Sequence, residues 1–322
     1  MVESPFIQIE NITKIFGKNI ILNNVNLIIP YKEIFGIIGK SGSGKTTLLN
    51  VLIGFLKPEK GKVLYQSRDI KIDPKSIKQQ FGFTAQQGSF YPKLTVKENL
   101  EYFGTMYNLS LLEVQEKIPG LLKLVNLEGK ENVVASKLSS GMQKRLDIAC
   151  GIIHDPKVLI LDEPTEDLDP VLRREILNLL KKINKEKEVT IIVTSHLLTE
   201  MENFCTKLAI LENKTIIEQG SVDELKDRYS KEQEIILETK SAKYSSLIKI
   251  LKKRKDIKKI SERYNKLVIY TKDPESVLKE ILSLTKKDKL LDLDINKPSL
   301  NEVFENLLKN LKEEKLENVQ NN

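Results

Sequence analysis

Residues 39–47 read Gly-Lys-Ser-Gly-Ser-Gly-Lys-Thr-Thr, a spacing that is typical of a loop that binds phosphate. Such glycines let bare backbone amides curl around a phosphate, and a helix that starts after Lys45 would direct its positive end toward it. Lys45 would neutralise charge on the β- and γ-phosphates, and the Thr46 hydroxyl would hold Mg²⁺. The predicted nucleotide-binding residues are therefore Gly39, Lys40, Ser41, Gly42, Ser43, Gly44, Lys45, Thr46 and Thr47.

Two neighbouring acids, Asp162 and Glu163, follow a short apolar run at 158–161. An aspartate at a strand end can orient water on Mg²⁺, and a neighbouring glutamate can act as general base for an attacking water molecule. Three more carboxylates follow within the next six residues, at Glu166, Asp167 and Asp169. Such crowding is unfavourable unless cations stand nearby, and Mg²⁺ together with Lys45 would provide them.

The strands that must position these residues can be read from apolar patterns. Residues 34–38 and 158–161 are apolar without polar alternation, which is typical of the buried middle of a parallel sheet. Residues 6–10 and 20–29 are rich in β-formers, with Asn23-Asn24 and Pro30 as expected breaks. The pattern predicts an α/β fold with a parallel sheet under the phosphate loop.

A mostly helical stretch at 95–153 separates the phosphate loop from the acids. Two sites in it match the capping box that starts a helix, one from Thr95 to Glu98 and one from Ser140 to Gln143. We therefore expect a helical subdomain over about residues 88–153.

The composition is that of an ordinary globular protein and excludes several classes. The chain has 322 residues, 40% of them hydrophobic, with only 15 Gly and 11 Pro, so collagen-like and wholly disordered chains are excluded. Two cysteines, Cys150 and Cys205, are too few for a disulfide framework and indicate free thiols in a reducing compartment. Neither a signal peptide nor an apolar run of about eighteen residues is present. We expect a cytoplasmic protein.

The net charge of +7 is concentrated in one basic octet, residues 252–259. This pattern favours the solvated face of a lysine-rich helix and the turn after it. The alternative is a surface for nucleic acid or anionic lipid, but no aromatic residue is interleaved with the cluster, as a single-strand binder would need.

The motifs occur in an order that resembles an ABC-type ATPase cassette, and the resemblance covers roughly residues 6–225. The order is Phe16, Gly39–Thr47, Gln86, Leu138-Ser139-Ser140-Gly141-Met142, Asp162-Glu163, Asp169 and His196. The Leu-Ser-x-Gly-x pattern some twenty residues before the acid pair is diagnostic, because other phosphate-loop enzymes lack it. The resemblance implies a P-loop ABC ATPase cassette with ATP and Mg²⁺ as ligands.

The resemblance also implies roles for single residues. Phe16 would stack on the adenine, although it could equally belong to the core. Gln86 would contact Mg²⁺ and sense the membrane partner, so the expected metal site comprises Thr46, Gln86 and Asp162. His196 would contact the γ-phosphate, which gives Glu163, His196 and Gln86 as catalytic residues.

In this family two cassettes close head to tail over ATP. Ser139, Ser140 and Gly141 would meet the γ-phosphate bound by the other subunit, and a helix starting near Ser139 offers a positive end for that purpose. Asp169 would belong to the loop that crosses the dimer. Because both halves of a complete site are present in this chain, we expect a homodimer.

Four positions depart from the family pattern, which usually has glycine there. They are Ser140 in the signature, Asp167 before Leu168-Asp169, Lys32 in the turn before Glu33, and Asn213-Lys214 in a late hairpin. Asn tolerates left-handed backbone, so the hairpin can survive. Asp167 places a side chain and a charge where the other subunit approaches, and we expect an active but slow ATPase.

Beyond residue 228 the pattern predicts a second, small α+β domain over 229–309, followed by a flexible polar tail at 310–322. Strands are expected at 234–239, 257–262, 266–271 and 290–295, with helices at 244–251, at 274–285 and after Pro298. This order is the split βαβ, ferredoxin-like arrangement. The ending Pro-Ser-Leu-Asn-Glu-Val-Phe resembles the accessory domain of many type-2 ABC exporter ATPases.

The predicted function is ATP hydrolysis that drives a separately encoded integral membrane permease, with export favoured over import. The protein would be cytoplasmic and bound through the permease to the inner face of the cell membrane. The alternative is a soluble ABC ATPase acting on nucleic acid or ribosomes. Its DNA-repair versions carry a long coiled coil between phosphate loop and acids, for which the segment from Lys45 to Asp162 leaves no room, and its ribosomal versions usually hold two cassettes. No direct nucleic-acid partner is therefore expected.

Overall fold

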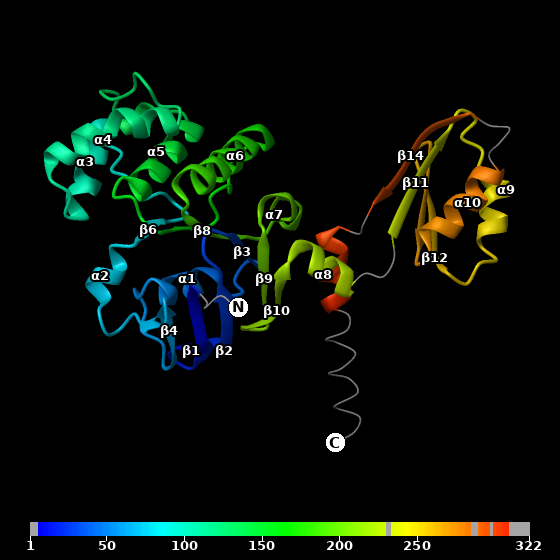
Figure 1. The fold of residues 1–322 in the computed structure, drawn as a ribbon, viewed down its shortest axis with the longest axis horizontal. Helices are drawn as coiled ribbons and strands as arrows, with labels where there is room; N and C mark the ends of the chain where they lie inside the picture. Colours follow the sequence, from blue (N-terminus) through cyan, green and yellow to red (C-terminus); the bar gives the residue numbers. More distant parts are fainter. Residues whose placement is uncertain (1–5, 230–232, 285–288, 297–298, 309–322) are drawn as a thin grey trace. The chain divides into compact units, whose positions relative to one another are not determined.

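The computed structural model describes residues 6–229, 233–284, 289–296 and 299–308 (Figure 1). The chain divides into two compact units, Met1–Ser221 and Val222–Asn322. The expected domain boundary, after residue 228, falls at the other end of helix α8 (Val222–Tyr229). The first unit contains all the residues to which the sequence assigns chemistry.

The first unit is built on a six-stranded sheet with the order β10-β9-β3-β8-β7-β6. Its strands are β3 (Ile34–Ile38), β6 (Phe81–Thr84), β7 (Val158–Leu161), β8 (Thr190–Ser195), β9 (Lys207–Glu212) and β10 (Thr215–Ser221). All neighbours from β9 to β6 are parallel, and β10 is antiparallel to β9. Strands β3, β7 and β8 are buried along their whole length, as the apolar runs at 34–38 and 158–161 predict for the first two. Since parallel strands end at one edge, the segments after β3, β6, β7 and β8 gather there.

A second sheet of this unit is antiparallel, with the order β2-β1-β4-β5. Its strands are β1 (Ile7–Phe16), β2 (Asn19–Ile29), β4 (Lys60–Tyr65) and β5 (Arg68–Asp69). The break expected at Asn23-Asn24 is wrong, because β2 continues through it. Asn24 instead takes a left-handed backbone, with φ of 50°, near register shifts between β1 and β2. Helix α1 shares one core with both sheets through residues such as Ile9, Phe35 and Leu49.

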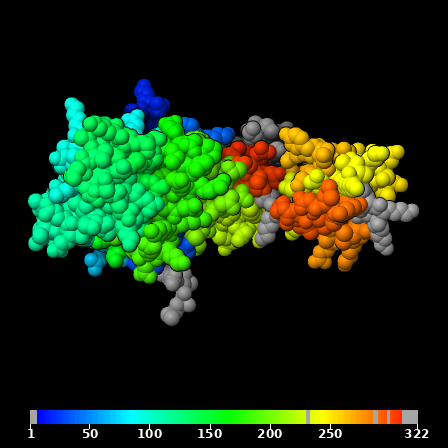
Figure 2. Space-filling view, turned by 90° about the horizontal axis from the view of Figure 1, so that it is seen from above, coloured from blue at the N-terminus to red at the C-terminus, as the bar shows by residue number. Residues whose placement is uncertain are grey.

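The helices of the first unit lie between its strands in the sequence. They are α1 (Lys45–Leu52), α2 (Pro74–Lys78), α3 (Val96–Met106), α4 (Leu111–Leu124), α5 (Ser140–Ile152), α6 (Pro170–Lys187) and α7 (Leu198–Phe204), with a 3₁₀ turn η1 (Ala135–Lys137). Helices α3 to α5 lie within residues 88–153, the range in which the sequence predicts a helical subdomain. Their residues, from cyan-green to green, gather into one lobe of this unit in Figure 2.

The helix starts test the two predicted capping boxes. The box at Thr95 is confirmed, because its hydroxyl accepts from the Glu98 amide while the Glu98 carboxylate accepts from the Thr95 amide. The box at Ser140 is wrong by one residue. The N-cap of α5 is Ser139, and the Gln143 side chain donates to carbonyls of the preceding segment instead.

The second unit contains a four-stranded antiparallel sheet with the order β12-β13-β11-β14. Its elements are α8, β11 (Gln233–Thr239), α9 (Ser245–Leu251), β12 (Ile257–Arg263), β13 (Lys266–Thr271), α10 (Pro274–Leu284), β14 (Leu290–Asn296) and a helix over 300–308. This order confirms the ferredoxin-like prediction. Helices α9 and α10 pack on one face of the sheet (Figure 1), around Ile235, Leu237, Ile269 and Ile281. Pro298 and the expected tail at 310–322 lie outside the described residues.

Two further predictions concern the cysteines and the membrane. Cys150 and Cys205 are both free and buried, as expected. Within the described ranges, no helix combines the length and apolar content that crossing a bilayer requires.

Candidate active site

The loop between β3 and α1 is shaped by glycines in the left-handed region. Gly42 has φ of 77° and Gly44 has φ of 106°. A side chain at Gly39 would come within 2.4 Å of a carbonyl of β9, so only glycine fits there. A Cβ added at Gly42 would meet no atom within 4 Å, which leaves an open cradle in front of the first turn of α1. The Ser43 hydroxyl is buried and, among the described residues, has no hydrogen-bond partner. A phosphate in the cradle would supply its missing acceptor.

Lys45 joins this loop to the acids that follow β7, two strands away in the sheet. Its side chain is 5% exposed, and its Nζ donates to the carbonyls of Gly39 (3.0 Å) and Lys40 (3.2 Å). The same Nζ lies 3.0 Å from Oε1 of Glu163. A buried ammonium group requires such partners, because burial without them would be costly. Of the five crowded acids, Lys45 thus pairs with Glu163.

The acid pair follows β7 and is held by a residue of β8. Asp162 is buried, and its Oδ1 accepts a hydrogen bond of 2.5 Å from the Thr194 hydroxyl. The same hydroxyl accepts from the Glu163 amide at 2.9 Å. Glu163 has φ of 48°, a left-handed backbone that is uncommon for a residue with a long side chain.

The carboxylate of Glu163 lies between two cationic or proton-bearing groups. Its Oε1 faces the Lys45 ammonium, and its Oε2 lies 2.5 Å from Nδ1 of His196, in the segment that follows β8. The carboxylate can only accept, so Nδ1 is the protonated nitrogen of the imidazole. Because β8 lies between β3 and β7, the three residues meet at one edge of the sheet.

Gln86 follows β6 at the same edge, and its side-chain amide donates to Oε2 of Glu166. Glu163, Glu166 and His196 offer ligand atoms that all lie within 4.8 Å of one another. Carboxylate, amide and hydroxyl oxygens are the donors that Mg²⁺ prefers, so the donor set of Thr46, Gln86 and Asp162 fits this cation in type. The side chain of Thr46 lies exposed in the first turn of α1.

The segment after Gln86 is tied to the helical subdomain by a buried acid. The Ser89 amide donates to Oδ1 of Asp147 on α5 at 2.7 Å. Burial raises the pKa of Asp147 to about 6, and the hydrogen bond from Ser89 opposes that rise. The contact connects the end of β6 with the helix that carries Ser139 and Ser140.

The loop before α6 keeps a glycine-like backbone without a glycine. Asp167 has φ of 59° and is exposed. Asp169 caps α6, where its Oδ1 accepts from the amides of Val171 (2.9 Å) and Leu172 (3.1 Å). The residue expected in the crossing loop therefore also stabilises a helix of its own chain.

A network of side chains from three elements holds this loop in place. Arg173 on α6 donates to the Leu168 carbonyl at 2.6 Å and to Glu200 on α7 at 3.1 Å. The Thr165 hydroxyl donates to the other oxygen of Glu200 at 3.1 Å. Since α7 starts two residues after His196, the network connects the loop to the histidine segment.

The signature residues lie apart from these groups, at the start of α5 in the helical subdomain. Ser139 and Ser140 are exposed, whereas Gly141 is buried and a Cβ there would come within 2.9 Å of Leu172. No contact described in the structure joins the three residues to the phosphate loop of the same chain. The sheet edge thus gathers Lys45, Gln86, Asp162, Glu163 and His196, but not the signature.

Phe16, the predicted adenine platform, ends β1 with 46% of its surface exposed. The Lys14 ammonium lies 5.1 Å from the centre of its ring. An exposed aromatic ring at a strand end is available for stacking, so the geometry is compatible with the expected role.

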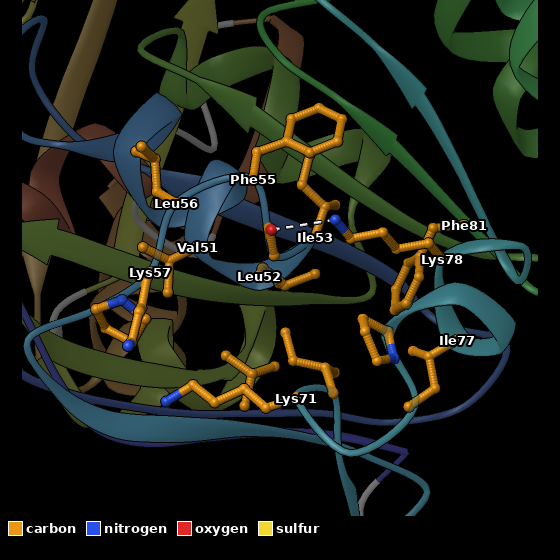
Figure 3. A pocket seen from close by; sticks show the side chains of 15 residues that line it. Val51, Leu52, Ile53, Phe55, Leu56, Lys57, Lys71, Ile77, Lys78 and Phe81 are labelled. Atoms are coloured by element: carbon orange, nitrogen blue, oxygen red, sulfur yellow. Dashed lines mark hydrogen bonds between the residues drawn. The ribbon is translucent and has the colours of Figure 1, made fainter.

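A larger hollow lies away from the chemistry, at the C-terminal end of α1. This cavity of about 460 Å³ is lined by apolar side chains of α1, β4 and α2, with lysines at its rim (Figure 3). Lys78 donates to the Gly54 carbonyl there at 3.2 Å. The recess beside the phosphate loop measures about 270 Å³. The larger cavity is therefore lined by none of the residues assigned to the chemistry.

Two residues of the site were not singled out in the sequence. Thr194 has no motif of its own, and only its position two residues before His196 could have suggested a role. Glu166 was noted as one of five crowded carboxylates, but its bond with Gln86 depends on β6 and β7 being neighbours.

Comparison with known proteins decides the family. The family model described as ABC transporter matches residues 22–166. The linearmycin resistance ATP-binding protein LnrL of Bacillus subtilis is 30% identical over 305 residues, covering 94% of this chain and 97% of the relative. The chain belongs to the ABC transporter ATP-binding proteins. This confirms the resemblance of the motifs, and the ABC ATPase has the expected cassette fold.

Further comparisons cover both units of this ABC ATPase. Residues 220–307 match the model described as ATP-binding protein DrrA1-3-like, C-terminal domain. The Nod factor export ATP-binding protein I of Bradyrhizobium diazoefficiens is 33% identical over 223 residues, covering 69% of this chain and 72% of the relative. The accessory domain expected from the last helix motif is thus confirmed as well.

Solved structures agree with the ATPase assignment. A dimeric bacterial ABC transporter cassette is 31% identical, with a TM-score of 0.60. The match covers 67% of this chain and 98% of the solved chain. A post-hydrolysis dimer of an ATP-binding cassette, bound to ADP and Pi, is 30% identical, with the same TM-score and the same coverage. The protein binds nucleotide and is an ATPase of this family.

Proposed function

We propose that this ABC ATPase hydrolyses Mg²⁺-ATP between two copies of its cassette and thereby drives a separately encoded membrane permease that exports its substrate. The observation that carries the proposal is the cluster of Lys45, Glu163 and His196 beside the phosphate loop. These are the charges that an ATP-hydrolysing site needs, at hydrogen-bonding distance from one another.

Each residue of the cluster has a distinct task in the proposed reaction. Lys45 would transfer its hydrogen bonds from the loop carbonyls to the β- and γ-phosphates. Glu163 would then be released from Lys45 and polarise the attacking water as general base. His196, which donates from Nδ1 to Glu163, would hold that carboxylate in place.

Charge neutralisation and positioning account for the rest of the mechanism. Bound Mg²⁺ would neutralise charge on the β- and γ-phosphate oxygens. Thr46, Gln86 and Asp162 would hold this cation. The amides of Gly42, Ser43 and Gly44 would orient the γ-phosphate for in-line attack.

The exposed start of α5 supports a dimeric site. Ser139 and Ser140 would contact the γ-phosphate bound by the other subunit, with Gly141 allowing α5 to pack close to α6. Asp167 and Asp169 would lie in the loop that meets the partner. Because one chain carries both the phosphate loop and the signature, the proposed dimer is a homodimer, with Phe16 stacked on adenine.

The relatives support an export role. They include an export ATP-binding protein for Nod factor and the bacitracin transport ATP-binding protein BcrA of Bacillus licheniformis, which is 32% identical over 230 residues. We propose that the permease binds this chain at the inner face of the membrane, and that nucleic acid is not a partner.

The proposal can be tested by assaying ATP hydrolysis of the purified chain with Mg²⁺ or with EDTA. Duplex DNA, RNA or the membrane protein that co-purifies with the tagged chain would then be added. We expect Mg²⁺-dependent hydrolysis that the membrane protein stimulates and nucleic acid does not. Stimulation by RNA or DNA, with a steep salt dependence, would contradict the proposed partner.

A further inference from the structure

The Thr194 hydroxyl contacts both members of the acid pair. Thr194 is fully buried on β8, the strand between β3, which leads into the phosphate loop, and β7, which leads into the acids. Its Oγ1 donates to Oδ1 of Asp162 at 2.5 Å and accepts from the Glu163 amide at 2.9 Å. We propose that Thr194 is a positioning residue that sets the geometry of both acids for ATP hydrolysis.

The hydroxyl is chemically suited to this double contact. A threonine hydroxyl has one proton to donate and can accept in return, and here it donates to the carboxylate and accepts from the amide. A branched side chain on a strand is restricted at χ1, so the oxygen is held in one direction. The hydrogen bond to the amide supports the left-handed backbone of Glu163. That backbone determines the direction in which the Glu163 side chain leaves the main chain.

Removing the hydroxyl would disturb both acids at once. Asp162 would keep a buried carboxylate oxygen without its donor, and the Glu163 amide would lose its acceptor. Either carboxylate could then turn away from the position that hydrolysis requires. A misplacement of about 1 Å in a catalytic arrangement can cost about a hundredfold in rate.

The inference rests on the proposed function, because it assumes that Asp162 and Glu163 act on Mg²⁺-ATP. The test compares Thr194→Val, which keeps the shape but removes the hydroxyl, with Thr194→Ser, which keeps the hydroxyl. Thr190→Val is the matched control. Thr190 is equally buried on the same strand, and its hydroxyl accepts from the Lys32 amide at 2.8 Å, four residues along β8 from Thr194.

For Thr194→Val we expect kcat to fall by about tenfold to a hundredfold, with KM for ATP changed by less than about threefold. The Mg²⁺ concentration that half-saturates binding of a fluorescent ATP analogue should rise by several-fold, since Asp162 is no longer oriented. Thr194→Ser should restore most of both quantities. Thr190→Val should lower thermal stability while leaving kcat and the Mg²⁺ dependence unchanged.

Two outcomes would overturn the inference. One is Thr194→Val with the kcat and Mg²⁺ dependence of the unmodified protein. The other is an equal loss of activity in Thr194→Val and Thr190→Val, because a merely structural hydroxyl would act through stability alone. A Glu163→Gln variant measured in parallel separates the two proposals. If Glu163→Gln keeps full turnover, the proposed function is wrong. If Glu163→Gln is inactive while Thr194→Val keeps full activity, the proposed function stands and the role of Thr194 is wrong.

Discussion

Lys45 is the residue whose partners must change most when nucleotide binds. In this structure its ammonium is shared between two loop carbonyls and Glu163. A triphosphate offers more negative charge than these three acceptors together, so an exchange of partners is favourable. The same exchange frees Glu163, which couples the arrival of ATP to release of the base.

Lys45→Ala should weaken nucleotide binding by tenfold or more. The variant removes the cation that meets the β- and γ-phosphates, worth about 1.4 kcal/mol or more at this fold-change. Calorimetric titration with ATP measures the effect. Lys62→Ala is a suitable control, because Lys62 forms a surface ion pair with Glu10 at 3.1 Å. Unchanged ATP affinity in Lys45→Ala would contradict the assigned role.

Asp167→Gly should raise stability by about 1 kcal/mol, because glycine adopts φ of 59° without steric cost. If the charge of Asp167 also opposes closure of the dimer, hydrolysis should rise as well, and most at low ionic strength. Asp167→Asn separates the two effects, since Asn removes the charge and tolerates a left-handed backbone. A loss of activity in Asp167→Gly would show that the carboxylate has acquired a favourable partner.

Single-residue chemistry could be predicted where a motif has fixed spacing. The phosphate loop and the acid pair were found because each chemical role lies within a short segment. Thr194 could not be found that way, because its role arises only when β8 lies beside β7. The backbone at Lys32, Asp167 and Asn213 stays left-handed although the family glycine is missing. Asn and Asp tolerate this conformation, whereas at Lys32 the fold holds the turn against side-chain preference.

The start of helix α5 could not be predicted to the residue from the capping-box pattern alone. Ser139 and Ser140 are both good N-cap residues, so sequence alone could not choose between them. The choice falls on Ser139 because the Gln143 side chain is occupied by the Ala135 and Leu138 carbonyls. A capping box there would have required Gln143 to bond back to the N-cap amide.

His154, just after α5, joins the helical subdomain to the central sheet. Its ring stacks on Tyr107 at 3.5 Å, and its Nε2 lies 3.2 Å from the Phe81 carbonyl of β6. Burial lowers the pKa of His154 to about 4, so the folded protein holds it neutral. These contacts give His154 a structural role.

The stabilising effect of neutral His154 should be lost in acid. It is fully present above pH 6.5, the pKa expected in the unfolded chain, and it falls as the pH drops from 6.5 to 4. His154→Phe keeps the stack on Tyr107 but cannot titrate. Chemical unfolding of both proteins between pH 7 and 4 should give a difference in stability that changes by about 3 kcal/mol across this window.

The comparison must be made between the two proteins rather than on one curve. Asp147 has its pKa raised to about 6, so its contribution has the opposite sign and grows as the pH falls toward 4. Subtracting the curve of His154→Phe from that of the unmodified protein removes this contribution. A difference that does not vary with pH would mean that His154 is not held neutral by the fold.

At the scale of the whole molecule, the order of elements in the second unit could be predicted, but the boundary could not. Helix α8 looks like the end of the cassette in sequence, yet it groups with the second unit. Its one buried residue, Leu225, is fully covered. Eight residues carry too little apolar periodicity to show whether a helix packs with the unit before it or the unit after it.

A chain that ends at Ser221 should therefore fold and keep basal Mg²⁺-dependent hydrolysis, because it retains all the residues assigned to the chemistry. A chain that ends at Tyr229 keeps α8 without the rest of its unit and should be less soluble, since Leu225 becomes exposed. ATP hydrolysis and gel filtration of both chains test this. Loss of ATP binding in the shorter chain would show that the second unit is needed to fold the cassette.

We propose above that Glu163 is the general base of an ATPase site closed by a second copy of the chain. The most direct measurement is ATP turnover and gel filtration of Glu163→Gln, which keeps the shape and removes the base. We predict that hydrolysis falls by about a hundredfold or more while ATP still binds, so that an ATP-bound dimer accumulates. Retained turnover would show that Glu163 is not the general base, and an ATP-bound variant that stays monomeric would show that a second copy does not close the site.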